Sequence, residues 1–135
     1  MQKDIEIPKV ENVYIAAIKE WNDDFMEQTW YAYLINDSEL KLEMAIVVSR
    51  AYGLLNGEQR KTGTFRHVFK EVEPFSYVKI ELLENNVLQL NNEFAVTYFI
   101  DNMLYDKTYT FRSNTINEHA FVEVPCINKK GVIVK

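Results

Sequence analysis

Apolar and polar residues alternate along much of this chain with the period of two that is typical of β-strands. Over residues 40–49, LKLEMAIVVS, one set of alternate positions is apolar throughout: Leu40, Leu42, Met44, Ile46 and Val48. Because successive side chains of a strand point to opposite faces of its sheet, we expect this set to face a core. The same alternation in SYVKIELL (76–83) and AFVEVPCI (120–127) predicts two further half-buried strands.

Residues 29–36, TWYAYLIN, are apolar at almost every position. Such a run predicts a strand that is covered on both faces or that lies against a partner. A small sandwich covers only one face of an outer strand unless a helix or another chain covers the other. We therefore predict a homodimer that forms through residues 29–35.

The segment EFAVTYFIDNMLYDKTYTF, residues 93–111, has the pattern of a β-hairpin. A two-residue turn at Asp101 and Asn102, both with positive φ, would fix its register. That register pairs three positions across the strands: Tyr98 with Tyr105, Phe94 with Tyr109, and Val96 with Lys107. The aromatic pairs would stabilise the hairpin. Lys107 would either meet the face of a ring or guard the edge of a sheet.

Clusters of polar residues predict the other turns. The polar stretches Asn-Asp-Asp at 22–24 and Asn-Asp-Ser-Glu at 36–39 separate pairs of apolar runs, which is typical of tight connections. In NKKGVIVK (128–135) we expect a four-residue turn with Gly131 at a position of positive φ, followed by a closing strand at 132–134. Pro125 places the preceding strand at a sheet edge.

One segment departs from the period of two. Its apolar residues follow the i, i+3, i+4, i+7 spacing of a helix: Phe65, Val68, Phe69 and Val72. Thr64 can cap such a helix and the pair at 73–74, Glu-Pro, can end it, so we predict a short helix near residues 64–72. The alternative is a strand with Phe65, His67 and Phe69 on one face.

These elements together predict a mainly β protein. About eight strands, short polar turns and one short helix are typical of an antiparallel β-sandwich or a strongly bent sheet. The length of 135 residues, with 47% hydrophobic and 13% aromatic residues, suits a single domain over residues 1–135.

Charge and targeting signals narrow the possible partners. The formal net charge is −5, which argues against nucleic acid as a partner because phosphate binding depends on clustered Lys and Arg. The first ten residues, MQKDIEIPKV, contain no long apolar run, so we expect neither a secretory signal nor a membrane segment. With Cys126 as the only cysteine, these features favour the cytoplasm.

Motifs for catalysis, cofactors and metals are missing from the sequence. Gly57 and Gly63 are not followed by the G-K-[ST] of a phosphate-binding loop, and two histidines with one cysteine are too few for a structural zinc site. Cys126 alternates with apolar residues, which favours an inert buried thiol over a nucleophile. We therefore predict no metal, no cofactor and no catalytic residue.

The only positively charged part of the chain is residues 50–70, which hold five bases and one acid. If residues 64–72 form a helix, its first amides and the nearby cations could seat an anion. The candidate site residues are Arg50, Arg60, Lys61, Thr64, Arg66 and His67. The alternative is that these charges balance the acidic surroundings through exposed ion pairs.

Three stretches resemble a small family of uncharacterised bacterial proteins: LNGEQRKTGTFRH (55–67), LNNEFAVTYFIDNMLYDKTYTF (90–111) and INKKGVIVK (127–135). The resemblance extends over most of the chain and implies no particular activity. Some members carry the label of a phenylalanyl-tRNA synthetase alpha subunit, an enzyme that requires a class II aminoacylation core. This chain is too short for that core and contains no G-x-G, so we interpret the label as a mislabelling that assigns no catalytic residues here.

Two functions remain from the sequence. The first is a non-catalytic β-sandwich that serves as a binding or assembly module, presenting an aromatic face or a sheet edge to another protein chain or to itself. The alternative is a protein that binds a small anionic ligand, or an enzyme, that uses the basic block at residues 50–67. Convergence of the basic side chains on one pocket would favour the second.

Overall fold

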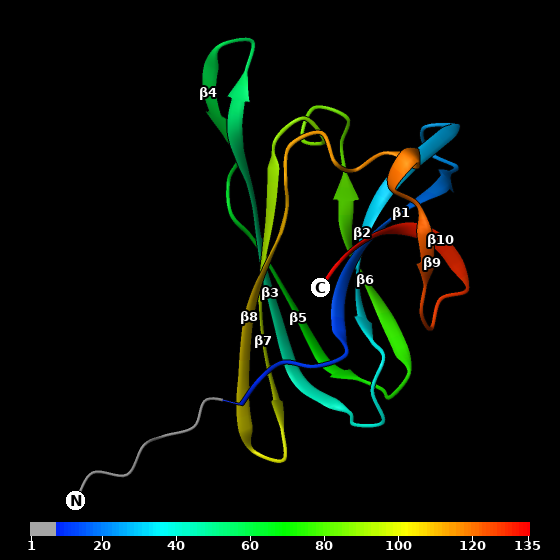
Figure 1. Cartoon of the computed structure of the whole chain (residues 1–135), viewed down its shortest axis with the longest axis vertical. Helices are drawn as coiled ribbons and strands as arrows, with labels where there is room; N and C mark the ends of the chain where they lie inside the picture. The colour runs from blue at the N-terminus through cyan, green and yellow to red at the C-terminus, as the bar shows by residue number, and fades with distance from the viewer. Residues whose placement is uncertain (1–7) are drawn as a thin grey trace, which may run out of the picture.

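The computed structural model describes residues 8–135, which form two antiparallel sheets packed face to face (Figure 1). The first sheet has the order β6-β2-β1-β10-β9, with the bounds β1 Val13–Asn22, β2 Glu27–Asn36, β6 Ser76–Leu83, β9 Val122–Val124 and β10 Lys129–Val134. The second has the order β4-β3-β7-β8, with the bounds β3 Leu42–Leu55, β4 Glu58–Lys61, β7 Asn91–Ile100 and β8 Met103–Phe111. Strand β5, Phe65–Val72, also pairs with β3. The prediction of a mainly β sandwich is confirmed.

The main core lies between the two sheets. The first sheet contributes Ile15, Ala17 and Leu34 to it, and the second contributes larger rings from β7 and β8. Outside the strands, the described residues include a short 3₁₀ turn at Glu118–Ala120. No helix within residues 8–135 is long and apolar enough to cross a membrane.

The outer face of the first sheet is covered by the chain's own C-terminal region. Val124 and Ile127 pack there against Tyr33 and Ile35 of β2. Both faces of β2 are therefore buried within one chain, as the apolar run in this strand predicted. The apolar run at residues 29–35 is therefore covered within one chain and does not by itself require a partner, and the homodimer stays a prediction.

The hairpin of β7 and β8 has the predicted register. Asp101 and Asn102 form the turn with φ of 49° and 64°, and Tyr98 pairs with Tyr105. Their rings are stacked with centroids 5.2 Å apart. Lys107 combines the two roles considered for it, because β8 is an edge strand and its Nζ lies 5.0 Å from the ring centroid of Tyr109.

The predicted helix at residues 64–72 is wrong, because these residues form strand β5. The alternative prediction, a strand, is correct: His67 and Phe69 lie on one face and pair with the inward-facing Val47 and Ala45 of β3. Val68 instead lies on the opposite, outer face. A segment this short has weak intrinsic preference, and the free edge of β3 offers it backbone hydrogen bonds that a two-turn helix lacks.

The predicted inward set of β3 is wrong beyond Leu42. Met44 has a φ of 48° and lies where the pairing with β7 shifts its register. This bulge reverses the alternation, so that Ala45 and Val47 are buried whereas Met44 is 45% exposed. Leu40, before the strand, is also exposed.

Gly131 was predicted in a turn with positive φ, and this prediction is also wrong. The turn residues with positive φ are Cys126 and Asn128, and Gly131 lies inside β10. A Cβ at this position would lie 2.6 Å from the carbonyl oxygen of Ala17. Glycine is therefore required by close packing against β1. Pro125 follows the edge strand β9, as predicted.

Candidate functional site

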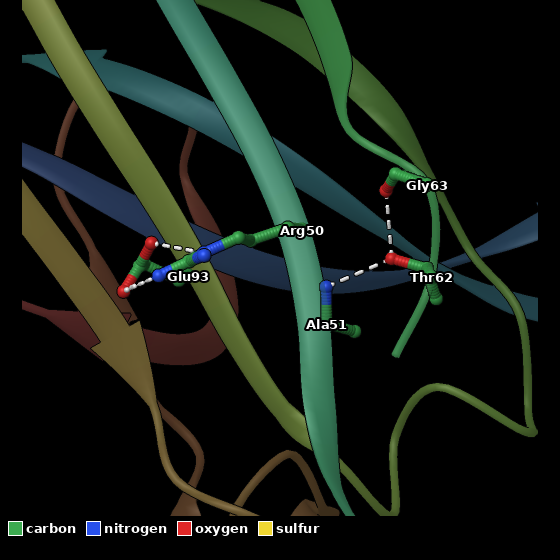
Figure 2. A network of polar contacts seen from close by, with 5 residues as sticks. All are labelled: Arg50, Ala51, Thr62, Gly63 and Glu93. Carbon is green, nitrogen blue, oxygen red and sulfur yellow. Dashed lines mark hydrogen bonds and ion pairs between the residues drawn. The ribbon is translucent and has the colours of Figure 1, made fainter. Parts of the chain in front are cut away.

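The basic side chains predicted to bind an anion are mostly paired with acids. The Arg50 Nε and Nη2 atoms donate to the two carboxylate oxygens of Glu93, at 2.6 and 3.4 Å, across β3 and β7 (Figure 2). Arg60 donates to Glu58 at 3.1 Å. Pairs of this kind are exposed and individually weak, yet they balance the positive charge and use part of the donors that an anion would need.

The same residues also lie in separate places. Arg60 and Lys61 line a shallow pocket of about 400 Å³ on the arm formed by β4 and the end of β3, which projects beyond the body of the protein (Figure 1). Arg50 and His67 are brought together at a different pocket, and Thr64 and Arg66 are exposed outside both pockets. Since β5 replaces the helix, no helix amides are present to complete an anion seat.

The pocket that contains His67 lies between the sheets and has a volume of about 320 Å³. β3 contributes Ser49, Arg50 and Ala51, β5 contributes Phe65 and His67, and β6 contributes Glu81, Leu82 and Leu83. The loop after β6 adds Glu84, Asn86 and Val87, and Asn92 and Phe94 come from β7. Thr62, between β4 and β5, also lines it, so residues from four strands and two connecting segments meet in one cavity with a largely apolar lining.

One carboxylate of this pocket joins three strands. Glu81 Oε1 accepts a short hydrogen bond from the Ser49 hydroxyl, and it lies 3.0 Å from His67 Nε2. Because Ser49 and His67 belong to the second sheet and Glu81 to the first, the contacts hold the sheets together at this edge. A Ser-His-acid triad would need the serine bonded to the histidine. Here the hydroxyl donates to the acid, so His67 is not positioned to activate Ser49.

Two more polar side chains fix the walls of the pocket. The Asn92 amide nitrogen donates to the carbonyl oxygens of Val87, at 2.8 Å, and Leu90, at 3.1 Å. The Thr62 hydroxyl accepts from the Ala51 amide and donates to the Gly63 carbonyl, both at 2.9 Å (Figure 2). These bonds hold the segments before β7 and between β4 and β5 against the strands.

A second candidate surface is the outer face of the β3–β5–β7–β8 sheet. The register places three pairs of apolar neighbours on it: Ile46 with Val68, Val48 with Ala95, and Phe99 with Leu104. Val68 is 53% exposed and Phe99 is 38% exposed. We name these six residues the outer apolar face. Unlike the outer face of the first sheet, it is not covered by a hydrophobic cluster of residues 8–135.

Metal ligands and a reactive thiol are not evident in the structure. Within residues 8–135, no three His, Cys, Asp or Glu side chains are grouped so that they could hold a metal ion. Burial, together with the charge of Asp37 and a hydrogen bond to it, raises the pKa of Cys126 to about 11. This thiol therefore stays protonated at neutral pH, in keeping with the inert role predicted for it.

No protein family, curated protein or solved structure matches this chain. The resemblance to a family of uncharacterised bacterial proteins therefore stays a prediction. What the chain does has to be inferred from its surfaces and its pocket.

Sequence analysis missed three residues of the pocket, Ser49, Glu81 and Asn92. Ser49 and Glu81 lie within strands predicted from alternation, and Asn92 lies one residue before the predicted hairpin at 93–111. No local motif distinguishes the three from other polar residues near such strands. Ser49 and Asn92 are buried polar side chains, and this could be inferred only with the correct inward face of β3 and the strand order.

Proposed function

We propose that this protein is a non-catalytic β-sandwich that acts as an assembly module, binding a second copy of itself through the outer apolar face. The observation that carries the proposal is the contrast between the two sheets. The chain covers most of the outer face of one sheet with Val124 and Ile127, leaving Tyr77 exposed on its edge strand β6. It leaves a row of apolar residues of the other sheet in contact with water. Exposed apolar surface within a polar rim is typical of a protein–protein interface.

The charges beside the face favour a second copy as the partner. Arg66 pairs with Val48 on the β5 side, and Asp106 pairs with Thr97 on the β8 side, so both point outward at opposite borders. A twofold axis parallel to the strands places β5 of one copy over β8 of the other. The register places Arg66 level with Thr108, two residues along β8 from Asp106. We infer that the long Arg66 side chain of one copy reaches Asp106 of the other, and that the symmetry forms this pair twice, as a self-complementary interface requires.

Binding through a sheet edge has less support. On the long edge strand β8, Lys107 lies on the inward side opposite Val96, and an inward charge on an edge strand hinders the addition of another strand. The other predicted function, binding of a small anion, also has less support, because the basic side chains are paired or dispersed.

Sedimentation velocity over about 10 μM to 1 mM tests the proposal, because mass action fills a weak dimer within this range. The wild-type chain is expected to rise from 15.9 kDa towards twice that mass. Val68→Lys should keep the protein monomeric, since it places a charge in the interface without touching the core. Val122→Lys, a change at a similarly exposed valine on the first sheet, is the matched control and should leave dimerisation unchanged.

A charge exchange tests the orientation of the two copies. Arg66→Asp and Asp106→Arg should each weaken the dimer, and the double variant should restore it. A mass of 15.9 kDa at every concentration would reject self-association through this face. Dimerisation that Val68→Lys leaves intact would mean that another surface is used.

A further inference from the structure

Most side-chain hydrogen-bond donors in the pocket between the sheets are already used by the protein, and the exposed amide of Asn86 is the exception. The Ser49 hydroxyl donates to Glu81, and the Thr62 hydroxyl donates to a backbone carbonyl. The Asn92 amide nitrogen donates to two carbonyls, and the Arg50 guanidinium donates to Glu93. A ligand that needs donors from the protein, such as a carboxylate or a phosphate, therefore meets few of them here.

Acceptors in the same pocket are left open. Hydrogen bonds to Glu81 reach only its Oε1 atom, and among residues 8–135 nothing donates to its Oε2 atom. Within the same residues, the Glu84 carboxylate and the amide oxygen of Asn92 also have no donor. Among residues 8–135, Thr29 Oγ1 is the one buried side-chain atom without a hydrogen-bond partner, so the amide oxygen of Asn92 is reached by water in the pocket. A ligand donor could replace that water.

The acidic side chains of the pocket also favour a ligand of positive charge. Glu81 and Glu84 both line it, whereas the charge of Arg50 is balanced by Glu93. Opposite charge on a ligand would therefore be favoured, and its hydrogen bonds to the carboxylates would be the strong, charge-assisted kind.

The remaining lining suits an apolar body. Phe94 and Leu83 are buried at the pocket, and Phe65 lines it with more than half of its surface exposed. An aromatic ring in this position can also contact a cation through its face. The volume of about 320 Å³ lies near the lower end of the range for small-molecule sites, which is about 300–1,000 Å³.

From these observations we propose that the pocket between β3, β5 and β6 binds a small organic cation, an amine or guanidine attached to a compact apolar group. The cationic head would donate to Glu81, Glu84 and Asn92, and the apolar group would pack against Phe94. This site lies on the inner side of the second sheet and does not depend on the proposed dimer.

An NMR titration with three size-matched probes tests this proposal. 2-Phenylethylamine, 2-phenylethanol and 3-phenylpropionate share an apolar body and differ in the charge of the head group. We expect saturable shifts of the Ser49, His67 and Phe94 amide signals with the amine. The alcohol should bind about tenfold more weakly or worse, because it lacks the charge-assisted bonds, and the carboxylate should not bind.

Variants assign the binding to this pocket. Glu81→Gln should weaken amine binding by about tenfold, the effect of losing one charge-assisted bond. Glu84→Gln removes an exposed charge outside the Ser49–Glu81–His67 contacts, so it should weaken binding while the fold persists. Glu123→Gln, an exposed acid on β9, is the control and should bind as the wild type does.

Two results would overturn the proposal. One is the lack of saturable shifts up to about 10 mM amine, a concentration that fills even a millimolar site. The other is binding of 3-phenylpropionate as strong as that of the amine, which would mean that charge does not select the ligand. Variants of the outer apolar face that lose the dimer, by contrast, should still bind the amine, because the pocket lies on the inner side of the sheet.

Discussion

Truncation of Tyr98 tests the packing of the β7–β8 hairpin. The side chain is 1% exposed, belongs to the core between the sheets and stacks on Tyr105. Tyr98→Ala removes an aromatic ring whose burial covers about 150–250 Å². At about 25 cal/mol per Å², the lost burial is worth about 4–6 kcal/mol as an upper limit.

Measured losses for such truncations are about 3–5 kcal/mol, so we expect a loss of about 4 kcal/mol. Urea denaturation followed by tryptophan fluorescence measures the free energy of unfolding of the variant and the wild type. If the protein is dimeric, both are compared at one low protein concentration at which the monomer dominates, because dimerisation adds to the apparent stability.

Phe99→Ala is the matched control for this prediction. Phe99 is the next residue on β7, and it lies on the outer face and is 38% exposed. Its truncation should cost less than about 1 kcal/mol, as is usual for surface positions. A loss below about 1 kcal/mol for Tyr98→Ala, or a larger loss for Phe99→Ala, would refute the assignment of the two faces of this strand.

Two other predictions concern close packing and pH. Gly131→Ala should destabilise the protein by about 1–3 kcal/mol in the same assay, because the new Cβ would meet the backbone oxygen of Ala17, whereas Gly63→Ala, in open space, should be nearly neutral. The raised pKa of Cys126, about 11, should make its alkylation by iodoacetamide at pH 8 about 100-fold slower in the native chain than in urea. The same raised pKa favours the folded state at pH below about 9, and this contribution should be lost as the pH rises towards 11, which pH-dependent urea denaturation measures against Cys126→Ala.

The β7–β8 hairpin could be predicted from the sequence because its determinants are local. Asp101 and Asn102 accept positive φ, and the strands on either side alternate without interruption. A two-residue turn and a strict alternation leave one register that buries the apolar faces. Every pairing of this hairpin therefore follows from residues that are close in the chain.

Strand β5 could not be assigned in this way because its structure depends on a distant partner. Phe65, Val68 and Phe69 fit a helix and a strand almost equally well in spacing. The pairing with β3 decides between them, since the edge of β3 is satisfied by the backbone of β5. Such tertiary preference regularly overrides local propensity in short segments.

The candidate sites show the same limit. Arg50, Arg60 and Arg66 are close in sequence, but strand geometry directs their side chains to different neighbours. Their side chains therefore do not converge on one anion site. Ser49 and Glu81, in contrast, are 32 positions apart and meet through a hydrogen bond. Charge composition is visible in a sequence, whereas convergence of side chains depends on the topology that brings the strands together.

The bulge at Met44 determines both candidate sites. With φ of 48°, a conformation that L-residues seldom adopt, it shifts the alternation of β3 by one position. Ser49 then faces the pocket, and Val48 faces outward. Without the bulge, Val48 would enter the core and Ser49 would lie on the outer face, so the pocket would lose its link to Glu81 and the outer surface its apolar centre. A residue keeps a strained conformation only where the packing and hydrogen bonds around it hold it there. Here the strained bulge gives one strand both a polar site on its inner face and an apolar surface on its outer face.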